Sequence, residues 1–143
     1  MQFATERKDF PAAQHAQMTR VAVMPDPPAS EYCTLGALWV SSSNFTEAES
    51  ALLKGLQKDP YSYACHVDLG GLYQQTGQLP LARENYEWVV RFFPADDVTI
   101  FKSLADIYVS LGDARSAQSI LRKGQRLFPG NAELQNAGGQ SAH

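Results

Sequence analysis

The sequence predicts an all-α protein, a solenoid of three helical hairpins preceded by half a hairpin. Two stretches with apolar residues at helical spacing, separated by a polar turn, occur in each of three consecutive blocks. Matching alanines and prolines recur at intervals of 34 and 35 residues: Ala48, Ala82 and Ala117, then Pro60, Pro94 and Pro129. Repeats of this length are typical of solenoids, because one hairpin cannot bury its apolar face alone.

The hairpins are expected at 29–62 (helices at about 30–42 and 46–58), 63–97 (helices at about 63–75 and 80–92) and 98–131 (helices at about 98–110 and 114–127). Capping signals support these boundaries. Thr46 and Glu49 have the spacing of a capping box, whereas Asp97 and Asp113 are expected to cap the two helices that follow them. Pro80 suits the first turn of a helix.

The two ends of the chain are expected to be incomplete repeats. Residues 1–28 contain a degenerate half repeat with a helix at about 10–24, because residues 10–13 align with residues 79–82. Gln17 and Arg20 replace the residues expected at close helix contacts there, which predicts looser packing. Residues 132–143 are expected to form a short capping helix, which Gly138-Gly139 would end, and a loose tail.

A common skeleton of large and small residues underlies the repeat. It reads Tyr32-x2-Leu35-Gly36-x2-Trp39, Ala48-x3-Leu52-x2-Gly55 and Pro60; then His66-x2-Leu69-Gly70-x2-Tyr73, Ala82-x3-Tyr86-x2-Val89 and Pro94; then Phe101-x2-Leu104-Ala105-x2-Tyr108, Ala117-x3-Leu121-x2-Gly124 and Pro129. This pattern resembles the tetratricopeptide repeat (TPR), whose signature is W-x2-L-G-x2-Y…A-x3-F…P. The resemblance implies a right-handed helical-hairpin solenoid of three TPR-like repeats plus an N-terminal half repeat.

The resemblance also implies a protein or peptide partner, held in a concave groove that the first helix of each repeat lines. By register, the groove residues would be Thr34, Ala37, Ser41, Val67, Asp68, Gly71, Gln75, Lys102 and Asp106. Most are small and neutral, which leaves room for a peptide backbone. The clamp of Lys, Asn and Arg side chains that some family members use for a C-terminal carboxylate is not matched, since only Lys102 fits it. Lys102 and Asp106 would otherwise form a surface ion pair.

Trp88 is a candidate contact on the opposite, convex face. The sister repeats have Lys54 and Lys123 at this position. An exposed tryptophan is typical of an interface hot spot. The alternative is that its ring lies along the side chains of Glu84 and Arg91.

Other classes of function find little support in the sequence. No phosphate-binding loop, metal-ligand spacing or nucleophile motif is present, so neither an enzyme nor a cofactor is expected. A net charge of −3 gives no electrostatic signal for nucleic acid, and no apolar run predicts a membrane span. Cys33 and Cys65 are expected to be free, half-buried thiols, because neighbouring first helices are not expected to bring their Cα atoms within about 7 Å.

The sequence therefore predicts a non-catalytic scaffold that recruits a partner segment in its concave groove. Two alternatives stay open. The chain would be the C-terminal accessory TPR region of a larger enzyme or membrane-associated assembly factor, or a structural subunit that self-associates through its terminal half repeat. Without a signal peptide, a complete chain would be cytoplasmic, whereas a fragment would also be compatible with the periplasm.

Overall fold

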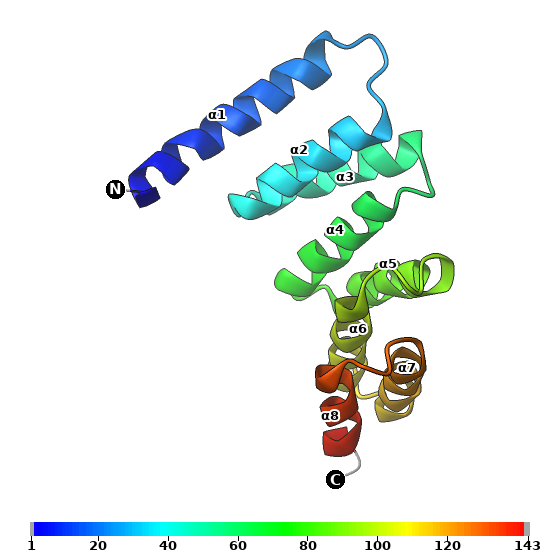
Figure 1. Ribbon diagram of the computed structural model, residues 1–143. Helices are drawn as coiled ribbons and strands as arrows, with labels where there is room; N and C mark the ends of the chain where they lie inside the picture. The colour runs from blue at the N-terminus through cyan, green and yellow to red at the C-terminus, as the bar shows by residue number, and fades with distance from the viewer. Residues whose placement is uncertain (1, 142–143) are drawn as a thin grey trace. The chain divides into compact units, whose positions relative to one another are not determined.

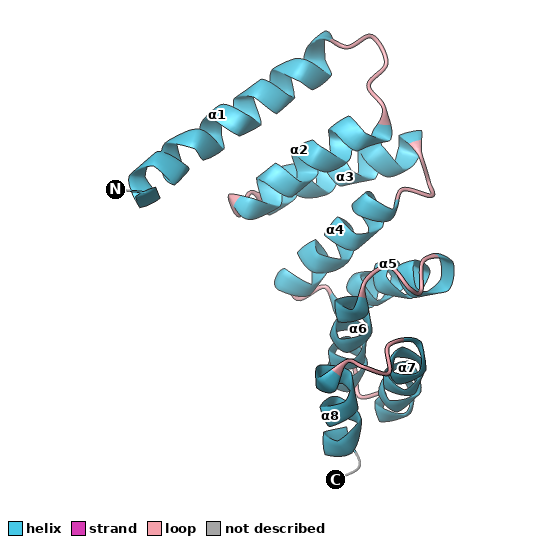
Figure 2. Ribbon diagram, viewed as in Figure 1, coloured by secondary structure: helices cyan, strands magenta, loops and turns pink. Residues whose placement is uncertain are grey.

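A computed structural model describes the backbone of residues 2–141 and the side chains of residues 11–137. The described residues form helices joined by short loops, with no strand among them (Figures 1 and 2). The helices are α1 (Gln2–Val23), α2 (Ala29–Ser41), α3 (Phe45–Lys58), α4 (Tyr63–Gln75), α5 (Leu79–Phe92), α6 (Val98–Ser110), α7 (Ala114–Leu127) and α8 (Ala132–Ser141). The predicted all-α class is confirmed.

The chain divides into two compact units, Met1–Leu72 and Tyr73–His143, with the boundary inside α4. In the first unit, α2 and α3 pack as a hairpin (Figure 1). Its contact depends on small residues: Ala48 is fully buried, and a Cβ added to Gly36 would lie 2.5 Å from the side chain of Leu52. Gly36 therefore lets α2 approach α3 more closely than any larger residue would.

Polar side chains attach α1 to α2. Gln14 is buried and donates through Nε2 to the carbonyl oxygen of Leu38 at 3.1 Å. Gln17 Nε2 donates to the Glu31 carboxylate at 2.7 Å, and Arg20 Nε lies 2.9 Å from the same carboxylate. Helix α1 therefore docks on α2 through hydrogen bonds and an ion pair, which include Gln17 and Arg20, the residues for which the sequence predicts looser packing.

The second unit contains the hairpin of α6 and α7, flanked by α5 and α8. Phe101 is buried against Gly124, where an added Cβ would lie 3.0 Å from the ring. Tyr108 donates its hydroxyl to the Glu87 carboxylate at 2.7 Å, which ties α6 to α5. Leu134 of α8 is buried, and its carbonyl oxygen accepts from Gln125 Nε2 at 2.9 Å.

Two of the predicted caps are present. The Asp97 side chain accepts from the Thr99 backbone N–H, and that of Asp113 accepts from the Ser116 N–H. The predicted capping box of Thr46 and Glu49 is wrong, because α3 already begins at Phe45 and places Thr46 inside the helix. The preceding turn ends with Ser43 at a positive φ of 63°, so the chain enters the helix earlier than the sequence pattern indicates.

The terminal helices are longer than expected. α1 begins at Gln2 and contains Pro11 within it, whereas the sequence predicts a start near residue 10. α8 runs through Gly138-Gly139 to Ser141, so the expected break at these glycines is wrong. Glycine costs a helix only about 1 kcal/mol relative to alanine, which weakens a helix without forbidding it.

Candidate functional site

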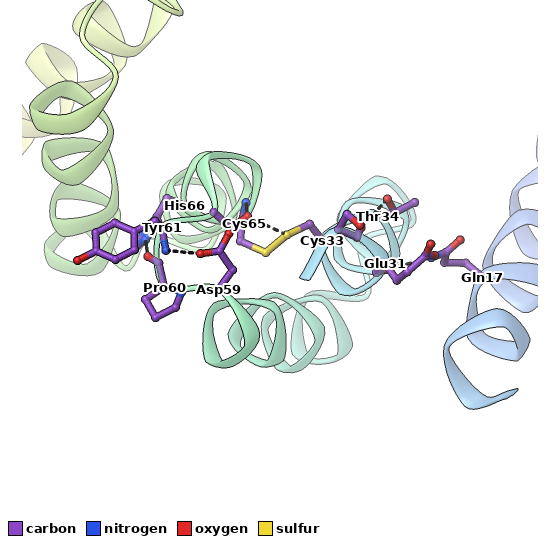
Figure 3. Close-up of a disulfide and its surroundings, with 11 residues drawn as sticks. Gln17, Glu31, Cys33, Thr34, Asp59, Pro60, Tyr61, Cys65 and His66 are labelled. Carbon is purple, nitrogen blue, oxygen red and sulfur yellow. Dashed lines mark hydrogen bonds between the residues drawn. A yellow bond between two sulfur atoms is a disulfide. The ribbon is translucent and has the colours of Figure 1, made fainter. Parts of the chain in front are cut away.

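Cys33 of α2 and Cys65 of α4 form a disulfide, so the prediction of free thiols is wrong (Figure 3). Their Cα atoms are 5.2 Å apart, well inside the range that a disulfide requires. Both cysteines lie near the start of their helices, where α2 and α4 come together beside α3. Gly55 of α3 makes the room: a Cβ there would lie 2.5 Å from Cys65 Sγ and 3.3 Å from Cys33 Sγ. The sequence places both cysteines on consecutive first helices, but it does not give the distance between those helices.

An open pocket of about 430 Å³ lies beside this disulfide. Small and hydroxyl-bearing residues dominate its lining, together with two carboxylates: Ala29, Ser30, Cys33, Thr34, Ala37, Asp59, Ser62, Ala64 and Asp68. Three of the predicted groove residues, Thr34, Ala37 and Asp68, are therefore brought together around one cavity. Asp59 and Ser62 were not among the predicted site residues, because they come from the loop between α3 and α4.

Asp68 is the chemically distinctive group of this pocket. Its side chain is half-buried, and burial raises its pKa from the usual 3.8 to about 6. No basic residue is among the described residues that line the pocket. The second carboxylate, Asp59, is exposed and accepts from the Tyr61 backbone N–H at 3.0 Å (Figure 3).

The other predicted groove residues of the first unit do not line this pocket. Ser41 is exposed and donates its hydroxyl to the carbonyl oxygen of Ala37 at 3.0 Å. Val67 and Gly71 are half-buried on α4. Their part in binding stays a prediction.

In the second unit, Lys102 lies between two carboxylates. Its Nζ is 3.9 Å from Asp106 Oδ2 and 3.8 Å from Glu133 Oε1. The expected ion pair with Asp106 is present, whereas Glu133 was missed, because only folding brings α8 against α6. All three residues line a pocket of about 200 Å³. The remaining predicted groove residue, Gln75, is exposed at the end of α4, and its part in binding stays a prediction.

Trp88 is half-buried on α5 and packs against aromatic rings. The centroid of its ring lies 5.0 Å from that of Phe92 and 5.6 Å from that of Phe93. The Arg91 guanidinium lies 5.5 Å from the centre of the Phe92 ring, and Phe92 is 46% exposed. This end of α5 therefore presents an aromatic cluster, and an interface role for Trp88 stays a prediction.

Two further kinds of site are absent from the part of the chain that the structure describes. His, Cys, Asp and Glu side chains form no group of three able to hold a metal ion there. None of the helices there is both long enough and apolar enough to cross a membrane.

Similarity to known proteins comes from structure. The sequence matches no protein-family model and no curated protein. The crystal structure of MamA resembles this chain with a TM-score of 0.83 at 18% identity, over 96% of this chain and 79% of MamA. The first TPR of Spaghetti (RPAP3) bound to an HSP90 peptide gives 0.70 at 17% identity, over 80% of this chain and 90% of that one. YrrB, a TPR protein with an unusual peptide-binding site, gives 0.76 at 14% identity, over 93% and 68%. The chain therefore has the tetratricopeptide-repeat fold that its sequence predicts.

Proposed function

We propose that this chain is a non-catalytic scaffold, which recruits a segment of another protein on the groove-facing side of its first helices. The observation that carries this function is the pocket of the first unit, where Thr34, Ala37 and Asp68 face a cavity instead of another helix. The surface lies on helices, so binding would order little of the chain, and that favours affinity. Two proteins of the same fold, one bound to an HSP90 peptide and one with a peptide-binding site, support this class of function.

The compartment in which the scaffold works is part of the proposal. Disulfides persist in oxidising compartments and are rare in the cytosol, so the Cys33–Cys65 bridge favours the periplasm or another oxidising location. The test is acid quenching of the native cells and alkylation of the denatured protein, before and after reduction, followed by mass spectrometry, because both cysteines are buried in the folded chain. Two alkylated cysteines would contradict this location, whereas alkylation only after reduction would support it.

A displayed library of random peptides tests the recruiting function. The baits would be the wild-type chain, a groove variant with Thr34→Arg and Lys102→Glu, and Trp88→Ala as a matched variant outside the groove. Thr34 is exposed, so its replacement should leave the helix contacts intact. We expect peptides that the wild type and Trp88→Ala enrich and the groove variant does not.

Two outcomes of this selection would count against the proposal. Peptides that only the Trp88→Ala variant fails to enrich would show that the aromatic cluster of α5, and not the groove, binds them. No enrichment above an unrelated helical protein would contradict peptide recruitment altogether.

Self-association is a second candidate, and one apolar pocket favours it. A cavity of about 340 Å³ opens beside α1, α2 and α3, with Met18, Val21, Tyr32, Leu35 and Trp39 in its lining. Met18 is 45% exposed, so a second copy would bury it. A solution mass that rises with concentration, and that Met18→Lys returns to the monomer value, would support this candidate. A monomer at every concentration would remove it.

A further inference from the structure

We propose that the pocket beside the Cys33–Cys65 disulfide receives an arginine side chain of the recruited segment and pairs it with Asp68. This inference rests on the proposed function and adds the chemistry that the partner must carry. It specifies one side chain, one cavity and one charged contact, all within the first unit.

The lining of the pocket suits the two parts of an arginine side chain. Ala29, Ala37 and Ala64 offer small apolar surface to the aliphatic stem. Polar atoms at the same cavity accept hydrogen bonds from a guanidinium group. The Thr34 hydroxyl donates its own hydrogen to the Ser30 carbonyl oxygen at 2.9 Å, so its oxygen is left as an acceptor.

The charge of the pocket also favours an arginine side chain. Two carboxylates and no basic residue are among the described lining residues, so the cavity is complementary to a cation. Burial raises the pKa of Asp68 to about 6, which leaves this carboxylate mostly ionised at neutral pH in surroundings that solvate it poorly. A cationic partner would restore the lost stabilisation. Arginine suits this place better than lysine, because a guanidinium is less strongly hydrated and binds a carboxylate through two hydrogen bonds.

The disulfide adds rigidity to the cavity. It joins α2 to α4 at the wall of the pocket, while Ser62 Oγ lies 3.3 Å from Cys33 Sγ. Figure 3 shows Cys33 with Thr34 on α2 and Cys65 across the bridge on α4. The positions from which α2 and α4 line the cavity are therefore held before a ligand arrives, which lowers the ordering cost of binding.

The experiment is a titration of the isotope-labelled full chain, followed by NMR at neutral pH. The probe is the tripeptide Ala-Arg-Ala with both ends blocked, and its control is the same peptide with citrulline, a neutral isostere of arginine. We expect the arginine peptide to shift the backbone amide signals of Ser30, Thr34 and Ala64. We expect it to bind about fivefold more tightly than the citrulline peptide, the ratio for one partly exposed ion pair.

Two variants locate the preference. Asp68→Asn keeps the shape of the side chain and should abolish the difference between the two peptides. Asp106→Asn is the matched control, because that carboxylate already faces Lys102 in the second unit, and it should keep the difference. Equal binding of the two peptides, no binding of either, or a preference that survives Asp68→Asn would each overturn the inference.

The failure of this inference is distinguishable from failure of the proposed function. Groove-dependent peptides that lack arginine, obtained from the displayed library, would preserve the recruiting scaffold and overturn the arginine site. A library without any groove-dependent peptide would overturn both.

Discussion

Asp68 on α4 and Lys102 on α6 carry the two charges of greatest interest on the predicted groove face, and their surroundings differ. Lys102 has carboxylates of its own chain at 3.9 Å and 3.8 Å, from Asp106 and Glu133. Asp68 lines a cavity, and the described residues around that cavity include no Lys, Arg or His. Burial raises the pKa of Asp68. Lys102 already pairs with carboxylates of its own chain, so a ligand gains less by contacting it. The pocket of Asp68 in the first unit is therefore the better candidate for binding a partner segment.

The elements around each charge account for this difference. In the second unit, α8 contacts α7 and supplies Glu133, and Lys102 and Asp106 are one helical turn apart on α6. In the first unit, alanines, hydroxyl-bearing residues and a disulfide surround Asp68.

Removal of the disulfide should have the largest effect. Cys33→Ser combined with Cys65→Ser opens a loop with a sequence separation of 32, and the entropy of the unfolded chain then rises. We expect the free energy of unfolding to fall by about 3–4 kcal/mol. Urea unfolding measures it, with the reduced wild type as the matched control, which should behave like the double variant. An unchanged midpoint would show that the bridge does not hold the Asp68 pocket together.

Gly55→Ala should destabilise the protein, because the added methyl group on α3 would overlap with the disulfide. The added Cβ would lie 2.5 Å from Cys65 Sγ, and a sulfur bonded at both ends has little freedom to move. Overpacking of this kind costs about 1–3 kcal/mol, and the gain in helix propensity offsets up to about 1 kcal/mol of it. We expect a net loss in thermal or urea unfolding that shrinks when both cysteines are serine. An equal loss of stability with and without the two Cys→Ser substitutions would show that the added methyl group does not act through the disulfide.

Asp68→Asn should stabilise the protein at neutral pH, by about 1 kcal/mol once the partial exposure of the side chain is allowed for. The folded pKa of about 6 lies above the ordinary value of 3.8, so between these values the folded state holds more protons than the unfolded state. The wild type therefore loses stability as pH rises from about 4 to about 6, after which the contribution is constant.

Urea unfolding at several pH values, with Asp68→Asn measured beside the wild type, isolates the contribution of Asp68 to the pH dependence of stability. The difference between the two proteins should grow across this pH window and then level off. A difference that is independent of pH would mean that Asp68 is ordinarily solvated, and the contrast with Lys102 would disappear.

Lys102→Met should have the smallest effect. Ion pairs at an exposed surface contribute about 0.2–1 kcal/mol, and the methionine keeps the packing of the aliphatic stem. We expect a loss of stability of less than about 1 kcal/mol that moderate salt removes in the wild type. A larger loss would show that Lys102 holds α8 in place, whereas no salt dependence would show that neither carboxylate stabilises it.

Several features of the fold follow from local sequence. The apolar periodicity predicts the six helices α2 to α7, and Asp97 and Asp113 fix two helix starts by their own side chains. Two predictions of helix ends from local sequence are wrong. Thr46 and Glu49 match a capping box, but a turn at Ser43 starts the helix earlier, and Gly138-Gly139 weaken α8 without ending it.

The candidate site also contains residues that the sequence predicts and residues that only folding brings together. Register alone predicts Thr34, Ala37 and Asp68 on one face, because helix periodicity sets the direction of a side chain. Asp59 and Ser62 were missed, since a loop after α3 brings them to the cavity. The ion pair of Lys102 with Asp106 needs only one helix, but its pairing with Glu133 requires α8.

By itself, the sequence determined the all-α class, the repeat of helical hairpins and the face that Thr34, Ala37 and Asp68 share, since all three depend on spacing along the chain. Tertiary structure alone decided that Cys33 and Cys65 are joined, that Gln14, Gln17 and Arg20 attach α1 to α2, and that Glu133 of α8 pairs with Lys102. Those outcomes depend on distances between helices, which are set by how closely residues such as Gly36 and Gly55 let neighbouring elements approach.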